Sequence, residues 1–322
     1  MALFARKVHN YDLFSGHAWY VPGIKGMFGF VGWYLLGALL GAMLLMIVLA
    51  FLPNETGTYY GLVLGYPLQF LPAMVFAAYQ SRRNMLFDPG YVLDSKHFSP
   101  YGMGIVILVT IAMTLASMIV FDAPNWWNMK LMDKLSVRFP FIENWYADTM
   151  ATMKILLNGP FVISFLVLAV LAPVFEEWLC RGMVLRGLLT KMKPVWAIVI
   201  SALFFAVIHL NPWQALNAFL IGLLMGYVYY KTGSLLLTML MHFVNNGTSV
   251  VLSHIESMKE YAEVTSLVEV MNMSTYLLVI AVSCIVLAAS LWAFSRIKVE
   301  NPWGNIDRIP PADAQVAAET MK

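Results

Sequence analysis

The sequence predicts an all-α, polytopic membrane protein, and two observations carry this prediction. Of the 322 residues, 60% are hydrophobic and only 12% are charged, with a mean hydropathy of +0.72. Soluble domains are about half apolar and about a quarter charged, so this composition is typical of a membrane protein. The apolar residues also form runs of about 20, the length of a helix that crosses a bilayer.

Eight apolar runs predict about eight transmembrane helices. Their approximate ranges are 27–52, 58–79, 101–121, 160–182, 195–210, 215–230, 235–253 and 275–295. The fifth and sixth runs are short, and the peptide NPWQ between them predicts a tight turn. Two small-xxx-small patterns, GALLG at 37–41 and GLLMG at 222–226, predict places where helices approach closely.

Loops rich in lysine and arginine alternate with the other loops, which predicts that both termini are cytoplasmic. Their basic residues are Arg6, Lys7, Lys25, Arg82, Arg83, Lys96, Arg186, Lys191, Lys193, Lys231, Arg296, Lys298 and Arg308. The long loop 122–159 carries mixed charge and aromatic residues on the predicted outer side, so we expect a short amphipathic helix at the interface. No block of basic residues interleaved with aromatics occurs. We therefore expect the lipid bilayer as a partner and no nucleic acid.

Polar clusters interrupt the apolar runs between residues 176 and 246. A charge at the centre of a bilayer costs roughly 2.5–3.5 kcal/mol, so such side chains usually face the interior of a helix bundle and serve function. The clusters are Glu176, Glu177 and Arg181; His209; and His242 with Asn246.

Helical spacing separates the two adjacent glutamates. Glu177 and Arg181 are four residues apart, so they share a helix face and are expected to pair. Glu176 is displaced from Arg181 by about 140° around the axis, which leaves its carboxylate available. His242 and Asn246 are also four apart and should project together.

Counting from the predicted helix corners places these clusters at similar depths. Glu176 lies 16 residues before Met192 and His209 lies 17 residues after it, in a corner marked by Pro194. At about 1.5 Å per residue, both stand about 25 Å from that corner and should face each other. This requires the fourth helix to run on to about Lys191. His242 and Asn246 stand roughly 12–20 Å from the next corner, KTGS at 231–234, so we expect one intramembrane site.

These residue types suit water-activating peptide hydrolysis. A carboxylate among apolar helices can take a proton from water, and a nearby imidazole can orient that water. A second imidazole and an amide N–H can stabilise the oxyanion that forms on an attacked carbonyl. The alternative is a divalent metal such as zinc, held by Glu176, His209 and His242. The HExxH motif is absent, so the types of the candidate ligands are the only support for a metal.

The three clusters, in this order, resemble the CPBP family of CAAX proteases and bacteriocin-processing enzymes, also called the abortive-infection family. That family shows EExxxR, FxxxH and HxxxN on successive helices. Here these motifs stand as Glu176 to Arg181, Phe205 to His209, and His242 to Asn246. The resemblance covers about residues 160–252, and the first 150 residues match no family pattern.

The resemblance implies an intramembrane endopeptidase of the CAAX type. It implies that Glu176 and His209 activate water and that His242 and Asn246 form the oxyanion hole. It also implies that Glu177 and Arg181 support the site, while we expect Phe205 to shape its wall. The substrate would be a membrane-associated protein or peptide. A prenylated substrate does not follow, because we expect the protein in a prokaryotic cytoplasmic membrane.

We expect one membrane domain with five parts. These are a cytoplasmic segment 1–26, accessory helices and the outer loop 27–157, a CPBP-like core 158–253, a loop and helix 254–295, and a disordered cytoplasmic tail 296–322.

Two other functions stay open. A non-catalytic immunity or scaffold protein could use the same polar cluster to bind a partner. A transporter is disfavoured because no internal repeat is visible. An activity lost on Glu176→Gln at unchanged abundance would favour the peptidase.

Overall fold

The structure, a computed structural model, describes residues 24–81, 100–189, 192–255 and 266–297. Helices dominate these residues and no strand occurs among them, which confirms the all-α fold class. The principal helices are α1 (Ile24–Phe51), α2 (Glu55–Ser81), α4 (Pro100–Val120), α5 (Asp122–Arg138), α6 (Pro140–Asn158), α10 (Pro194–Ile208), α11 (Pro212–Thr232), α12 (Leu235–His254) and α14 (Met273–Ser295). Residues 1–23 of the predicted segment 1–26 and residues 298–322 of the predicted tail 296–322 lie outside the described residues.

The predicted count of eight transmembrane helices is not confirmed. Six helices of the described chain are long and apolar enough to cross a membrane. The other two predicted runs do form helices, but α10 has only 15 residues and α11 is not among the six candidates. At about 1.5 Å per residue, α10 is about 22 Å long, which is shorter than a hydrocarbon core of about 30 Å.

The helix that carries the two glutamates runs without interruption from Phe161 to Leu189, as the predicted depths require. Its successive parts are α7 (Phe161–Ser164), η2 (Phe165–Leu171), α8 (Ala172–Glu177), η3 (Trp178–Leu185) and α9 (Arg186–Leu189). The parts η2 and η3 have wider π-type turns, which occur often at functional sites. The second wide stretch begins directly after Glu177.

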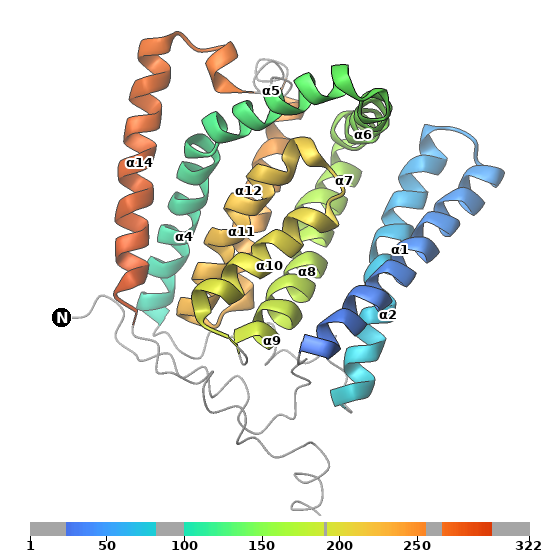
Figure 1. The fold of residues 1–322 in the computed structure, drawn as a ribbon, viewed down its shortest axis with the longest axis horizontal. Coiled ribbons are helices and arrows are strands. Elements are labelled where there is room, and N and C mark those ends of the chain that lie inside the picture. Colours follow the sequence, from blue (N-terminus) through green and yellow to red (C-terminus); the bar gives the residue numbers. More distant parts are fainter. Residues whose placement is uncertain (1–23, 82–99, 190–191, 256–265, 298–322) are drawn as a thin grey trace, which may run out of the picture.

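The helices form a row across the molecule (Figure 1). The hairpin of α1 and α2 stands at one edge, α4 and α14 stand at the other, and the glutamate helix with α10, α11 and α12 lies between them. Many large apolar side chains of α1, α2 and α14 are exposed, which suits contact with lipid. The protein is therefore an integral membrane protein.

The predicted close approaches occur in two hairpins. In the α1–α2 hairpin, a Cβ atom at Gly37 would overlap the carbonyl oxygen of Gln69, and one at Gly41 would lie 2.7 Å from the carbonyl oxygen of Gly65. In the α10–α11 hairpin, a Cβ at Gly222 would lie 3.1 Å from Cβ of Ala202. Both glycine patterns therefore serve helix packing.

The outer loop forms two helices, α5 and α6, instead of the one short helix that we expect from its sequence. Helix α5 crosses one end of the molecule and covers the start of α11 (Figure 1). The amide nitrogen of Asn128 donates to the carbonyl oxygens of Pro212 and Trp213, at 2.9 and 2.8 Å. The outer helices thus hold the end of the α10–α11 turn. The orientation of the protein in the membrane stays a prediction.

Candidate active site

Glu176, the penultimate residue of α8, lies at the centre of the polar cluster. Its Oε1 accepts a hydrogen bond from the hydroxyl of Tyr66 on α2. Its Oε2 lies 3.6 Å from Nε2 of His209 and 4.0 Å from Nε2 of His242. Within the described part of the chain this oxygen is buried and has no hydrogen-bond partner. The structure thus brings together the acid and both histidines of the sequence-predicted site.

The other ring nitrogen of each histidine is already engaged. Nδ1 of His209 lies 2.7 Å from the carbonyl oxygen of Phe205, and Nδ1 of His242 lies 3.1 Å from Oε1 of Glu177. Carbonyl and carboxylate oxygens only accept, so these contacts place a proton on each Nδ1. In the neutral rings, both Nε2 lone pairs then face Glu176. A water molecule that donates its protons suits this converging set of acceptors.

Glu177 and Arg181 form the ion pair that their spacing predicts. Nη1 of Arg181 lies 2.6 Å from Oε1 of Glu177, and both side chains are 0% exposed. Nη2 of Arg181 donates to the carbonyl oxygen of Gly222 at 3.1 Å, which ties α11 to the glutamate helix. Because Glu177 also contacts His242, one buried carboxylate holds both a cation and a site imidazole.

Phe205 occupies the space between these groups. Its ring meets the rings of His209 and His242 edge to face, with centroids 4.7 and 5.5 Å apart. The guanidinium carbon of Arg181 lies 4.5 Å from the centroid of the same ring. Phe205 is 2% exposed, so it fixes both imidazoles and the arginine as well as forming the expected wall.

Asn246 is placed differently from the three other candidate residues. Its amide nitrogen donates to the carbonyl oxygen of Leu168 at 2.9 Å, and its amide oxygen accepts from Asn245 at 3.0 Å. Among the described hydrogen bonds, none joins Asn246 to Glu176 or to either histidine. The contact to Leu168 ties α12 to the wide-turned stretch η2, and the expected oxyanion role stays a prediction.

The chain turns sharply directly after His209. Helix α10 ends at Ile208 and His209 caps it, and Leu210 then adopts a positive φ of 48°, a conformation that is uncommon for a residue with a branched side chain. Asn211 then accepts from the backbone N–H groups of Trp213 and Gln214, and Pro212 takes the first helical position. The turn therefore presents His209 at the end of a short helix, beside Glu176.

Tyr66 is a site residue that the sequence reasoning missed. It lies inside an apolar span, where a tyrosine is most often read as packing, and Pro67 follows it directly. The available signal was a hydrogen-bonding side chain within a predicted span that has two internal prolines, Pro67 and Pro72. Which helix that hydroxyl faces depends on tertiary packing.

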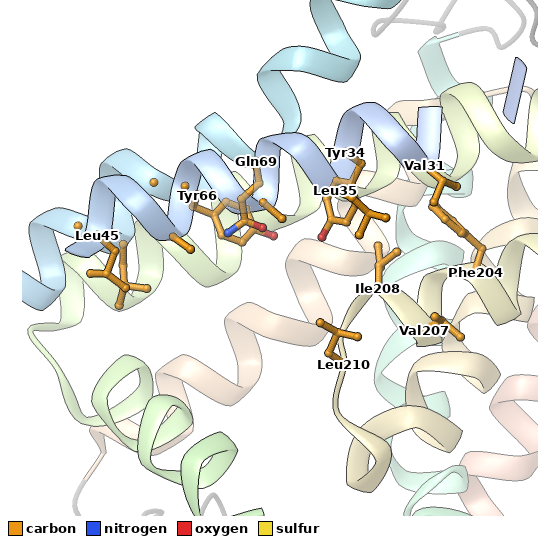
Figure 2. A pocket seen from close by; sticks show the side chains of 16 residues that line it. Val31, Tyr34, Leu35, Leu45, Tyr66, Gln69, Phe204, Val207, Ile208 and Leu210 are labelled. Carbon is orange, nitrogen blue, oxygen red and sulfur yellow. The ribbon is translucent and has the colours of Figure 1, made fainter. Parts of the chain in front are cut away.

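An apolar cavity of about 520 Å³ lies between the α1–α2 hairpin and the end of α10 (Figure 2). Its hydrogen-bonding side chains are Tyr34, Tyr66 and Gln69, and the rest of its lining is apolar or glycine. Ile208 and Leu210, the residues on either side of His209, line it too. The cavity therefore adjoins both Glu176, through Tyr66, and His209.

The donor types of Glu176, His209 and His242 suit a divalent metal, and metal-ligating histidines usually donate from the second ring nitrogen in the same way. Among the described residues, however, no group of three His, Cys, Asp or Glu side chains is arranged to hold a metal ion. A metal at this site therefore stays a prediction, and the proposed reaction is derived from the protein's own residues alone.

A comparison with protein families finds a match, over residues 158–248, to the family described as Rce1-like type II CAAX prenyl endopeptidases. This segment contains Glu176, His209, His242 and Asn246, whereas Tyr66 lies outside it. The match confirms the resemblance that the three motifs predict, and at family level it indicates an intramembrane CAAX-type protease. No curated protein and no solved structure gives a significant match.

Proposed function

We propose that the protein is an intramembrane endopeptidase that cleaves a membrane-associated protein or peptide with a water activated by Glu176 and His209. The observation that carries this proposal is the convergence of Glu176 Oε2 with the Nε2 atoms of two histidines inside the helix bundle. A water bound there would meet a general base and an imidazole that orients it.

In this mechanism Glu176 takes a proton from the water while the oxygen attacks the substrate carbonyl. The resulting oxyanion needs a donor, and His242 provides one in its doubly protonated form, in which Nδ1 donates to Glu177 at 3.1 Å and Nε2 donates to the oxyanion. Asn246 contributes its remaining amide proton. Glu176 then passes its proton to the leaving amine, which completes hydrolysis.

The cavity beside Tyr66 and His209 supports a substrate with an apolar portion next to the cleaved bond. Its volume of about 520 Å³ lies within the range typical of ligand pockets. Because the candidate membrane-spanning helices α1 and α2 line much of the cavity, its occupant is expected to be anchored in or on the bilayer.

The first test compares new peptide termini, by mass spectrometry, in membranes of cells that express the unmodified protein or its Glu176→Gln variant. Loss of the general base should lower turnover by at least about 100-fold, so termini should appear only with the unmodified protein. Glu143→Gln, a change on the exposed outer helix α6, is the matched control and should cleave normally. All three proteins are compared at equal abundance.

Identical terminal profiles with Glu176→Gln and the unmodified protein would contradict the proposal. They would favour the immunity or scaffold role, in which the polar cluster binds a partner without cleaving it.

A further inference from the structure

We propose that Tyr66 is a positioning residue for the reaction, acting through Glu176, and that the active site therefore needs the α1–α2 hairpin. The inference rests on the proposed function and adds a residue outside the matched segment 158–248. Tyr66 is 110 residues from Glu176 in the sequence, yet its hydroxyl donates to Oε1 of that carboxylate.

The two carboxylate oxygens have different partners. Oε1 takes the tyrosine hydroxyl, whereas Oε2 faces Nε2 of His209 at 3.6 Å. A carboxylate without the first contact can rotate about its last side-chain bond and present either oxygen in several directions. The tyrosine removes that freedom and keeps Oε2 pointed at the water site, which is the orientation that the reaction needs.

Aromatic contacts on both sides of Glu176 hold the α1–α2 hairpin, and with it Tyr66, against the glutamate helix. Phe175, directly before Glu176, stacks on Phe70 of α2 with centroids 5.4 Å apart. Trp178, two residues after Glu176, meets Phe30 of α1 edge to face at 6.3 Å. Phe30 and Phe70 are almost completely buried, so the hairpin cannot shift without losing these contacts.

Tyr66 also lines the cavity (Figure 2), which makes a second interpretation testable. A tyrosine that only contacts the substrate would change KM when its hydroxyl is removed. A tyrosine that orients Glu176 would change kcat and leave KM alone, because the substrate is bound before the carboxylate acts.

The experiment measures kcat and KM of Tyr66→Phe in purified, full-length protein, with the substrate that the terminal profiles identify. The ring of Tyr66 lies 5.6 Å from that of Phe70 between centroids, and this contact remains in the variant, so folded abundance should be unchanged. We expect kcat to fall by up to about 100-fold with KM unchanged. Tyr60→Phe, an exposed position on the same helix, is the matched control and should leave both constants unchanged.

A second variant separates orientation from packing. Difluorotyrosine at position 66 keeps nearly the same volume but is a stronger hydrogen-bond donor, so kcat should change while KM and the melting temperature stay the same. An unchanged kcat in both variants, or a change in KM alone, would overturn the inference. Neither result touches the proposed function, which fails only if cleavage survives Glu176→Gln.

Discussion

The α10–α11 and α1–α2 hairpins both contact Glu176, and different interactions hold each of them against the glutamate helix. The α10–α11 hairpin brings His209 to Oε2 of Glu176, and Arg181, which is ion-paired with Glu177 in the glutamate helix, ties the hairpin to that helix by donating to the carbonyl oxygen of Gly222. The α1–α2 hairpin brings Tyr66 to Oε1 and is held by aromatic packing, such as that of Phe70 on Phe175.

The internal packing of the two hairpins differs as well. The helices of the α1–α2 hairpin meet backbone to backbone, since a Cβ at Gly41 would lie 2.7 Å from a carbonyl oxygen. In the α10–α11 hairpin, a Cβ at Gly226 would instead lie 3.0 Å from Cγ2 of Ile198, which is a side-chain atom. A side chain can give way where a backbone cannot. The two hairpins should therefore fail under different substitutions.

The largest effect is expected on the charged side of this comparison. Arg181→Met would leave Glu177 buried without its cation, which should cost about 3–5 kcal/mol of stability. We expect a sharp loss of folded protein in detergent, measured by thermal melting. Adding Glu177→Gln to this variant should restore much of the stability, because no uncompensated charge remains.

Arg138→Met, at an exposed position at the end of α5, is the control and should melt like the unmodified protein. Equal melting of Arg181→Met and the control would show that the ion pair does not hold the α10–α11 hairpin.

A smaller and more selective effect is expected from the glycines. In Gly37→Ala the new methyl group overlaps the backbone oxygen of Gln69, so the α1–α2 hairpin must open at a cost of about 1–3 kcal/mol. In Gly226→Ala the side chain of Ile198 can move, and the gain in helix propensity of about 1 kcal/mol offsets much of the strain. Thermal melting of both variants compares them directly, and equal losses would remove the distinction between the hairpins.

The smallest effect is expected from metal removal. Because the proposed mechanism uses Glu176 and the two histidines without a metal, cleavage should be unchanged after treatment with 1,10-phenanthroline. The measurement is the initial rate before and after treatment, with a zinc-dependent protease as the positive control. If treatment abolished cleavage and added zinc restored it, both histidines would be assigned to metal binding instead of water orientation.

The local parts of the fold and site were predictable. Hydropathy located the apolar helices, and the four-residue spacing paired Glu177 with Arg181 because both lie on one turn of the same helix. Helical rise counted from the Pro194 corner put Glu176 and His209 at one depth, since consecutive helices that share a corner are neighbours. Hydropathy also marked α10 and α11 as spans, which is not confirmed, because α10 has only 15 residues and α11 is not among the six candidate spans.

The sequence by itself determined the helical class, the order of the three motifs, and the spacing that pairs Arg181 with Glu177 and leaves Glu176 available. These follow from periodicity within single helices and between adjacent ones. Only the tertiary structure decided that Tyr66 completes the site and that Asn246 binds the carbonyl oxygen of Leu168. Both contacts join helices that are far apart in the chain. Such contacts depend on side-chain shapes at the packed surfaces, which no regular spacing in the sequence records.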